Sequence, residues 1–500
     1  MLKKIRRVIL VLLATLVGGG ALLHFFFGMQ IVLDGGGAPH VRFVESASEQ
    51  AARIEQHRAS QRAQVPAATQ AAPAAQGAPS AQESGVRNQE SEGSEVTAAP
   101  DASAPSESTN TNTLRLWWTD FRGPRRDGVY AGPVNTKWPT GGLRPMWKQP
   151  IGGGYASFVI VGGRAFTIEQ RGAKEVVSAY DVKSGRELWT NTWDAAFTES
   201  MGGDGPRATP TWSDGRVYAL GAIGEMRALD DRTGRTIWRT NILADSGAAN
   251  LPWGMSAAPL VLGNAVIVLP GGPRGASVAA YDRATGKRLW SALGDAQGYA
   301  SPMFVTLAGV PQLVIFGATR LIGLSPDGAK ELWSYPWATQ NGINAAQPLV
   351  IGENRLFLSS SYGTGAAVIE LTKSDEGLSV REVWRNTRMK NRFASSVLRD
   401  GVIYGLDESI LTSVDADTGE QKWKGGRYGY GQLLLADDHL IVLTEDGDLV
   451  LVRATPDRHE EVARFHVLDG KTWNVPAIAD GYLLVRNLAE MAAFDLRIAR

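Results

Sequence analysis

The sequence predicts an all-β fold, an eight-bladed β-propeller of four-stranded antiparallel blades, preceded by an N-terminal transmembrane helix. Three observations predict the propeller. A phrase of the form [AS]-x-D-x-x-[ST]-G-x-x-x-W recurs along the chain, eight closing aromatic residues stand 39 to 52 residues apart, and eight apolar strands follow turn residues at matching intervals. Repeats of this length are typical of four-stranded propeller blades.

The four clearest copies of the phrase end at Trp189, Trp238, Trp290 and Trp423. In each copy the Asp can accept backbone hydrogen bonds and the Gly can adopt positive φ, so the phrase encodes a tight turn between two antiparallel strands. The closing Trp is too large for one small sheet to cover, and we expect it to pack against a neighbouring blade. Weaker copies complete a set of eight docking aromatics: Trp147, Trp189, Trp238, Trp290, Trp333, Trp384, Trp423 and Phe465.

The two ends of the folded region are expected to share one blade. Leu143 to Gln149 supplies a closing strand with no blade before it, whereas Met491 to Leu496 is a third strand with no closing strand after it. Pairing them would bury both terminal strand edges and close the ring. We therefore place the propeller over residues 143–500 and a lead-in segment over 113–142.

Composition excludes several classes of function. Lys and Arg balance Asp and Glu at 51 each, which leaves no global field to attract nucleic acid, and no nucleic-acid partner is expected. The chain has no cysteine, so it has no disulfide, thiolate zinc site, c-type haem attachment or lipoprotein acylation site. Its six histidines are scattered without metal-ligand spacing, and no metal site is expected.

The N-terminus predicts a membrane anchor. A basic segment over residues 1–7 precedes the apolar run from Val8 to Phe27, whose roughly 20 residues can cross a ~30 Å hydrocarbon layer. We place a signal anchor over 8–29, with residues 1–7 in the cytoplasm and everything downstream outside it. The alternative is a cleaved signal peptide, since Val8 to Val17 has the length of its apolar region and is followed by three glycines.

Residues 45–112 are predicted to be a disordered linker. They are rich in Ala, Pro, Ser, Glu, Gln and Thr and nearly free of aromatics, so they cannot bury enough apolar surface to offset the entropy of ordering. As a flexible coil this linker would span about 45 Å, which would let the propeller sample a broad layer outside the membrane. A short helix around Ser48 to Gln64 is left open.

From about Trp117 to Leu496 the chain resembles the pyrroloquinoline quinone (PQQ) propeller superfamily, through its tryptophan-docking repeat. Trp117 to Gly128 also resembles the W-x-x-F-R-G-P-x-R-D-G lead-in of PQQ-like bacterial propellers. The resemblance implies one of two activities. Quinoprotein alcohol and glucose dehydrogenases use PQQ and calcium, whereas BamB-type subunits assist insertion of outer-membrane β-barrels and bind no cofactor. Alcohol dehydrogenases of this class carry a vicinal cysteine disulfide, which this chain cannot form.

We therefore expect a non-catalytic protein-binding or assembly scaffold, without a cofactor, in the periplasm. It would be held by a single pass in the inner membrane and would bind envelope proteins or a membrane complex. The familiar BamB subunit is anchored in the outer membrane through an N-terminal cysteine that this chain lacks, so a role in barrel assembly rests on analogy of fold and compartment. The alternatives are a PQQ-dependent dehydrogenase and a sensor that binds a small ligand or polysaccharide in the channel.

Ligands in this superfamily bind at one face of the propeller, around the channel. Arg171 and Arg207 could converge on an anion there, or the charges could instead pair across blades and seal the channel. Four acidic residues, Asp407, Glu408, Glu445 and Asp446, have calcium-type oxygens but match no EF-hand loop. No catalytic residue is predicted, and the candidate ligand-binding residues are Glu169, Gln170, Arg171, Arg207, Met255, Ser256, Tyr299, Asn344, Asn391, Arg392, Tyr430, Trp473 and Asn474.

Overall fold

The computed structural model describes residues 29–32, 40–43, 45–63 and 116–498. The anchor is predicted over residues 8–29, of which 8–28 lie outside the described residues. Its last residue, Met29, begins strand β1 (Met29–Val32). β1 pairs antiparallel with β2 (His40–Phe43), with Met29 opposite Phe43. Within the described ranges, no helix combines the length and the apolar character that a membrane crossing needs.

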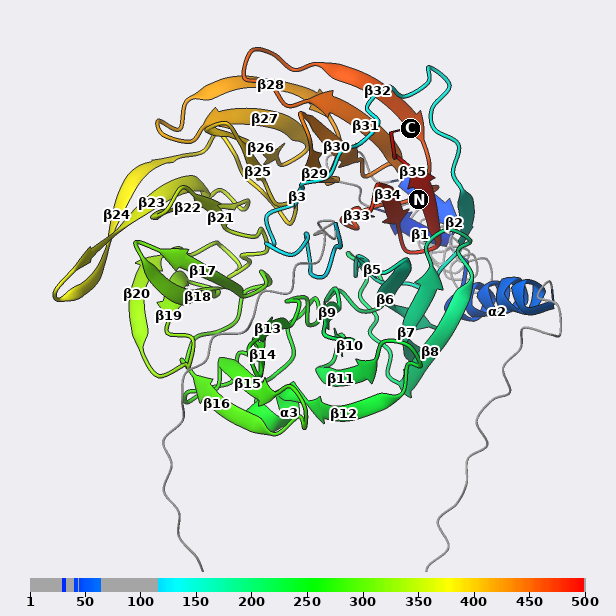
Figure 1. Ribbon diagram of the computed structural model, residues 1–500, viewed down its shortest axis with the longest axis horizontal. Coiled ribbons are helices and arrows are strands. Elements are labelled where there is room, and N and C mark those ends of the chain that lie inside the picture. The colour runs from blue at the N-terminus through cyan, green and yellow to red at the C-terminus, as the bar shows by residue number, and fades with distance from the viewer. Residues whose placement is uncertain (1–28, 33–39, 44, 64–115, 499–500) are drawn as a thin grey trace, which may run out of the picture.

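Eight sheets of antiparallel strands surround a central axis, which confirms the predicted eight-bladed propeller (Figure 1). Each blade runs outward from a short innermost strand to an outermost strand. The strands of the first four blades are β5 (Val159–Val161), β6 (Arg164–Arg171), β7 (Lys174–Asp181) and β8 (Glu187–Asp194); β9 (Thr211–Ser213), β10 (Arg216–Leu220), β11 (Glu225–Asp230) and β12 (Thr236–Asn241); β13 (Leu260–Leu262), β14 (Ala265–Val268), β15 (Val278–Asp282) and β16 (Arg288–Ala292); and β17 (Met303–Leu307), β18 (Val310–Phe316), β19 (Arg320–Leu324) and β20 (Glu331–Pro336).

Blades 5 to 8 repeat the pattern with two variations. Blade 7 gains a fifth strand from the lead-in, and blade 8 is completed by a strand from the N-terminal side. Their strands are β21 (Leu349–Ile351), β22 (Arg355–Ser360), β23 (Gly365–Ser374) and β24 (Gly377–Asn386); β25 (Val397–Arg399), β26 (Val402–Asp407), β27 (Ile410–Asp415) and β28 (Gln421–Arg427); β29 (Gln432–Ala436), β30 (His439–Leu443), β31 (Asp448–Arg453), β32 (Glu461–His466) and β3 (Val129–Tyr130); and β33 (Ala477–Ala479), β34 (Tyr482–Arg486), β35 (Glu490–Asp495) and β4 (Trp147–Pro150).

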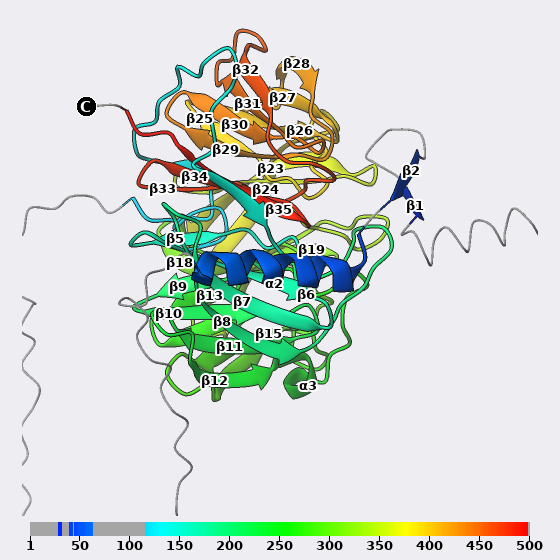
Figure 2. The same cartoon turned by 90° about the vertical axis from the view of Figure 1, so that its right-hand side faces the viewer.

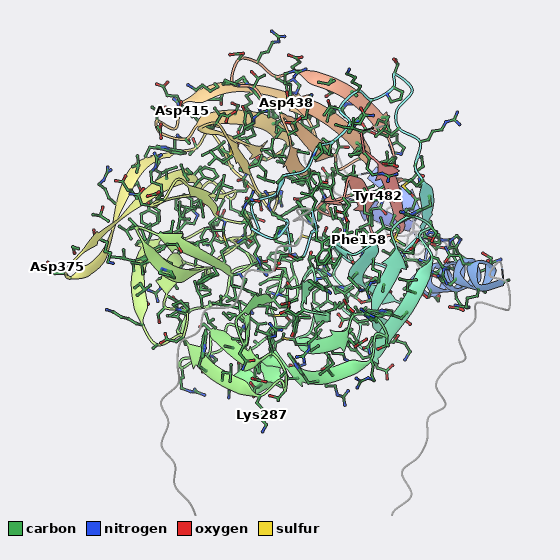
Figure 3. The ribbon with its side chains drawn as sticks, in the orientation of Figure 1. Phe158, Lys287, Asp375, Asp415, Asp438 and Tyr482 are labelled. Carbon is green, nitrogen blue, oxygen red and sulfur yellow. The ribbon has the colours of Figure 1, made fainter. Side chains whose placement is uncertain are left out.

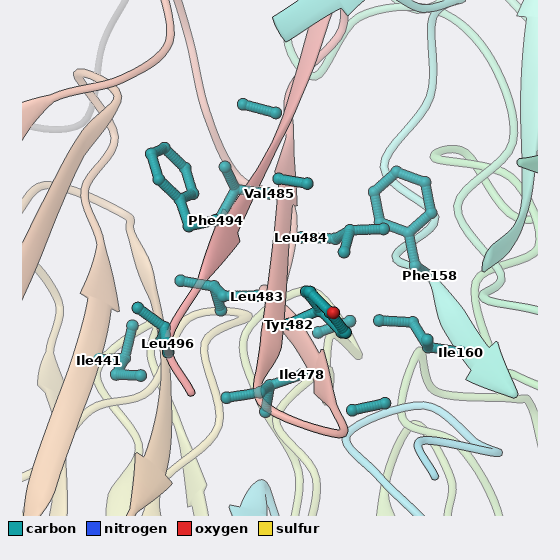
Figure 4. Packing of buried hydrophobic residues seen from close by; sticks show 14 of the residues in the cluster. Phe158, Ile160, Ile441, Ile478, Tyr482, Leu483, Leu484, Val485, Phe494 and Leu496 are labelled. Atoms are coloured by element: carbon teal, nitrogen blue, oxygen red, sulfur yellow. The ribbon is translucent and has the colours of Figure 1, made fainter. Parts of the chain in front are cut away.

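The predicted closure of the ring is confirmed. β4 pairs antiparallel with β35, with Trp147 opposite Ala493, so both ends of the folded region share blade 8. The interior at this joint is continuous with the neighbouring blades: Phe158 of the loop before β5 and Ile441 of β30 belong to the same buried cluster as Leu484 of β34 (Figure 4). Burial of this apolar surface is the main stabilisation of the closed ring.

The docking aromatics pack against the turn of the following blade. A Cβ on Gly234 would lie 2.4 Å from Trp189, and one on Gly328 would lie 2.4 Å from Trp290. Indole N–H groups also cross these joints, since Trp189 Nε1 donates to the Asp231 carbonyl at 3.1 Å. The repeat therefore encodes the joint between blades as well as the turn within one.

Two docking aromatics depart from this pattern. Trp333 donates instead to Gln312 of its own blade. The neighbouring blade 5 has a long β23–β24 hairpin, which reaches beyond the rim at Asp375 (Figure 3). Phe465 packs beneath Gly142, which belongs to the lead-in rather than to a blade turn. The weak copies of the repeat therefore mark joints whose partner surface differs.

The lead-in enters the ring and crosses its axis. Trp118 forms a bridge with Ile160 of the innermost strand β5, and β3 adds to the inner edge of β29 in parallel. Between these points Arg122 donates to the Ser396 carbonyl at 2.7 Å, and Arg126 donates to the Pro302 carbonyl at 2.9 Å on another side of the ring. The lead-in thus fills the axis and satisfies the free edges of innermost strands.

Helix α2 (Ala47–Ala63) lies against the outside of the joint between blades 8 and 1 (Figure 2). Residues 45–63 were expected to belong to the linker, and the structure differs because Ile54 and Arg58 are buried against the propeller. The rest of the predicted linker that precedes Leu116 lies outside the described residues. A second, short helix, α3 (Ile242–Ser246), follows β12.

Candidate functional site

The two faces of the propeller differ in which loops they carry. One face carries the loops that lead from each outermost strand to the next innermost strand, together with the turns between second and third strands. We call this face the mouth face. The lead-in enters from the opposite face, since the Leu116 carbonyl accepts a hydrogen bond from Asp480 in the turn between β33 and β34. The lead-in and the mouth-face loops therefore approach the axis from opposite faces.

Four aromatic rings meet on the mouth face, from the loops of blades 6, 7, 8 and 1. Trp473 lies 4.8 Å from Phe393, 5.5 Å from Tyr155 and 6.3 Å from Tyr430, measured between ring centroids. Each ring comes from the loop before a different innermost strand, β33, β25, β5 and β29. All four are half-buried, so their outer surfaces remain available to a partner. We call these four residues the axial cluster.

Two arginines flank the axial cluster. The Arg392 guanidinium lies 4.4 Å from the Tyr430 ring centroid and 5.5 Å from that of Tyr362, and it donates to the Tyr430 hydroxyl. The Arg207 guanidinium lies 4.5 Å from the Phe197 ring and 5.7 Å from the Tyr155 ring. Cation–π stacking of this kind is strengthened where water is partly excluded.

Arg207 is held by its own loop. Its guanidinium donates to the Gly203 carbonyl at 2.5 Å and to the Gly205 carbonyl, so the charge is bonded to neutral oxygens. Burial lowers the pKa of Arg207 and raises that of the neighbouring Tyr155 hydroxyl, because burial disfavours both charged forms. The nearby carboxylates of Glu199 and Asp204 act on the pKa of Arg207 in the opposite direction to burial.

Two of the four acidic residues considered as calcium ligands, Asp407 and Glu445, are engaged in other contacts. Glu445 is buried and accepts hydrogen bonds from Trp473 Nε1 at 2.8 Å and from the Tyr430 backbone at 3.0 Å, so it orients two rings of the axial cluster. Asp407 pairs with Lys390 at 2.8 Å and also with Lys424. In the part of the chain that the structure describes, no group of His, Cys, Asp or Glu side chains could hold a metal ion.

Arg171 and Arg207 do not converge. Arg171 lies in the joint between blades 8 and 1, where it pairs with Glu187 at 2.5 Å and with Glu169 at 2.6 Å. Arg486 is also fully buried there and donates to the Gly152 carbonyl at 2.7 Å. Both ion pairs of Arg171 therefore stay within blade 1, while the charge of Arg486, in blade 8, acts on Glu169 across the joint.

Glu169 is ionised in this joint although it is fully buried. Burial by itself would raise its pKa, but Arg171 and Arg486 more than offset that and lower the pKa to about 2. Its carboxylate also accepts hydrogen bonds from the hydroxyls of Ser178 and Tyr180, both at 2.7 Å. The joint cluster therefore depends on a carboxylate that stays charged.

The remaining predicted residues mostly hold loops in place. Gln170 accepts a hydrogen bond from the Phe197 backbone at 2.8 Å, and Ser256 donates to the Tyr299 carbonyl at 2.8 Å. Tyr299 itself is half-buried on the mouth face beside Trp253. The other four are fully buried within the loops that enter innermost strands: Met255, Asn344, Asn391 and Asn474.

Sequence reasoning missed two members of the axial cluster, Tyr155 and Phe393, and the role of the lead-in. Both aromatics stand in loops before innermost strands, so an inventory of aromatic residues in those loops would have found them. Arg122 and Arg126 belong to the recognised lead-in phrase, but no sequence signal shows that they cross the axis.

The residues at the mouth do not fit PQQ. A flat quinone needs a slot between facing rings, but the rings of the axial cluster lie in mutual contact. Glu445, a carboxylate that contacts this cluster, is occupied by hydrogen bonds from Trp473 and the Tyr430 backbone. We therefore derive no redox step for this site.

Comparison with known proteins agrees with this architecture. The family model described as outer membrane protein assembly factor BamB matches residues 173–425, about half of the chain. A protein named outer membrane protein assembly factor BamB from Bordetella pertussis is 23% identical over 292 residues, covering 56% of this chain and 68% of that protein. The quinohemoprotein alcohol dehydrogenase ADH-IIG of Pseudomonas putida is 29% identical over 182 residues, but these cover only 22% of its length and 34% of this chain.

Solved structures show the same fold at low sequence identity. BamB from Moraxella catarrhalis aligns with a TM-score of 0.52 at 15% identity, over 72% of this chain and 99% of that one. The quinohemoprotein alcohol dehydrogenase of Comamonas testosteroni aligns with a TM-score of 0.56 at 15% identity, over 78% and 82%. From the repeat, the eight blades and the family match, the chain belongs to the family described as outer membrane protein assembly factor BamB, within the PQQ-like β-propeller superfamily.

Proposed function

We propose that this protein is a non-catalytic scaffold of the bacterial envelope that binds partner proteins through its mouth face and serves outer-membrane protein assembly. In this proposal the apolar run from Val8 to Phe27 holds it in the inner membrane by a single pass, with the propeller in the periplasm. Membership of the BamB family and the basic segment before the apolar run support the proposal.

The observation that carries the proposal is the axial cluster with its two arginines. Trp, Tyr and Arg are the residues that most often dominate binding energy at protein interfaces, because they offer large, rigid contact area together with a polar group. Here they stand together on the mouth face, while the lead-in bonds to inner loops of the ring through Arg122. A partner segment would therefore lie across the mouth rather than enter a channel.

The test is quantitative co-purification from membranes in mild detergent, using the full-length chain. We expect Trp473→Ala and Arg392→Ala to lower recovery of envelope partners by about ten-fold or more, as is usual for hot-spot residues. The control is Lys287→Ala, which removes an exposed side chain on the outer rim, away from the axial cluster (Figure 3). Recovery that is unchanged in both mouth variants would refute binding through the mouth face.

The same preparation separates the two alternatives from the proposal. A PQQ-dependent dehydrogenase would reduce an artificial electron acceptor when PQQ, calcium and an alcohol or sugar are added, and that result would overturn a non-catalytic role. A sensor would instead show a thermal shift with a small ligand or polysaccharide that is lost in Trp473→Ala. We expect neither response.

A further inference from the structure

The direction in which α2 runs fixes which face of the propeller lies next to the N-terminal chain. Its first turns lie at the mouth face, where Gln50 donates to the carbonyls of Leu488 at 2.6 Å and Ile151 at 3.3 Å. Farther along, Arg58 and Gln61 both donate to Gln149 in β4. The helix therefore runs from the mouth face toward the opposite face, as the side view shows (Figure 2).

The docking of α2 is specific rather than incidental. The Arg58 guanidinium is 1% exposed, stacks 5.0 Å from the Tyr180 ring centroid, donates to the Pro150 carbonyl at 3.1 Å and lies 3.5 Å from Glu187. Removing a buried arginine from such a set of partners typically costs a few kcal/mol. The helix start is equally defined, because Ser46 and Glu49 form a reciprocal capping box.

The described chain before α2 keeps Met29 close to the start of that helix. Met29 stands opposite Phe43 in the β1–β2 pair, which places their Cα atoms about 5 Å apart. From Phe43 to Ala47 the chain can span at most about 14 Å. Met29, the last residue of the predicted anchor, therefore lies within about 20 Å of the start of α2, whereas a disordered linker over residues 45–112 would span about 45 Å.

We propose that α2 clamps the propeller with its mouth face toward the inner membrane, so that the axial cluster meets partners at the membrane surface. This rests on the membrane anchor of the proposed function. The described chain resumes at Leu116 on the face opposite the mouth, which is the face toward which α2 runs. The clamp thus makes the protein oriented rather than freely tethered.

The first experiment tests the clamp by disulfide cross-linking. Because the chain has no native cysteine, only the introduced cysteines can react. A Cβ on Gly172 would lie 3.9 Å from the Ala51 Cβ, within the range of a disulfide. We expect Ala51→Cys with Gly172→Cys to cross-link within one chain in membranes under mild oxidation. The matched control pairs Ala51→Cys with Gly163→Cys, a turn glycine of similar φ at the other end of blade 1, and should not cross-link. Equal cross-linking in both pairs, or in neither, would overturn the docking.

The second experiment tests orientation in proteoliposomes that contain the full-length chain. A donor dye is placed either on Met201→Cys, 60% exposed at the mouth face, or on Lys183→Cys in the turn between β7 and β8 at the opposite face. The eight residues of β6 span about 27 Å, so transfer to acceptor-labelled lipid headgroups should be roughly two-fold or more stronger from Met201→Cys. Arg58→Ala should abolish the difference, and Arg62→Ala, which alters an exposed ion pair of the same helix, should not.

The outcomes separate this proposal from the one on which it rests. A chain that does not float with the vesicles has no membrane anchor, which would overturn both the anchoring and the orientation. A chain that floats but shows equal transfer from the two positions, or stronger transfer from Lys183→Cys, would overturn the clamp alone. Loss of partner recovery without any change in transfer would overturn partner binding and leave the orientation standing.

Discussion

The turn glycines of the repeat meet two separate requirements, and a matched pair of substitutions can separate them. Gly234 has φ +71°, and a Cβ on it would lie 2.4 Å from Trp189. Gly163 has φ +75°, but no atom lies within 4 Å of its Cβ position. Either glycine replaced by alanine forces an L residue into the left-handed region, at about 1–2 kcal/mol. Only Gly234→Ala also drives a side chain into an indole.

The added cost at Gly234 depends on whether the indole can move. Trp189 is held by the hydrogen bond from Nε1 to the Asp231 carbonyl and by the Phe166 ring, whose centroid lies 5.8 Å away. Overpacking of a well-packed site costs about 1–3 kcal/mol, and loss of the hydrogen bond would add about 1 kcal/mol. We therefore expect Gly234→Ala to destabilise the propeller by about 2–6 kcal/mol and Gly163→Ala by about 1–2 kcal/mol.

Urea unfolding of the full-length chain in detergent measures the difference, with tryptophan fluorescence and far-UV circular dichroism as two probes. Under identical conditions the midpoint of Gly234→Ala should fall well below that of Gly163→Ala, and the near-UV signal of the indoles should change only in the former. Equal midpoints would refute the reasoning, since the glycine would then serve only the turn.

Three further predictions concern the lead-in, the joint and the closing strand. Arg122→Ala should cost about 3 kcal/mol, because it removes a buried charged donor to backbone carbonyls, while Arg125→Ala, at a side chain 62% exposed, should leave the urea midpoint unchanged. The pKa of Glu169 is held at about 2 in the folded state against an ordinary value of 4.5. The wild-type free energy of unfolding should therefore fall by about 3 kcal/mol as pH falls from about 4.5 to 2. In acid titration, Glu169→Gln should flatten that part of the stability profile. Trp147→Ala should cost about 3–5 kcal/mol and should make β4 and β35 exchange amide hydrogens before other strands do, whereas simultaneous exchange around the ring would contradict closure at blade 8.

The blades could be predicted because their signals are local and repeated. Asp230 accepts a hydrogen bond from the Thr233 backbone at 2.9 Å inside the turn, as the phrase requires. Closure could be predicted as well. The strand at Leu143 to Gln149 has no blade before it, and the last blade, which ends at Leu496, lacks its closing strand. Phe465, in a weak copy, still contacts the next blade, since its ring lies 6.0 Å from that of Phe494 in β35, although its turn partner Gly142 comes from the lead-in.

Helix α2 was harder to predict, although its capping box is visible in the sequence at Ser46 and Glu49. Its composition is polar, so propensity and pattern alone do not distinguish it from the linker that follows. The helix is stabilised by Ile54 and Arg58 docking at a joint that exists only once blades 8 and 1 have met. This is a tertiary effect that single-sequence reasoning does not contain.

The candidate site was half predicted for a similar reason. Residues 169 and 171 are two apart on β6, so their side chains point to the same side of the blade, whereas Gln170 points to the other. Strand alternation thus places Arg171 with Glu169 in the joint and away from Arg207. The rings of the axial cluster come from four loops far apart in sequence, and only the closed ring brings them together.

The lead-in explains why an arginine-rich phrase recurs at the start of such a propeller. Innermost strands present unpaired carbonyl groups to the axis, and a guanidinium with five donors and no acceptor can bond several of them at once. Arg126 donates to the carbonyls of Ala258 and Pro302 in two blades, and Arg122 to those of Ser396 and Leu433 in two others. Both arginines adopt positive φ, +62° at Arg122 and +57° at Arg126, which is unfavourable for a side-chain-bearing residue. Such strain persists only where surrounding contacts over-determine it, so the lead-in must be held by the assembled ring. The lead-in and the blades therefore form one folding unit.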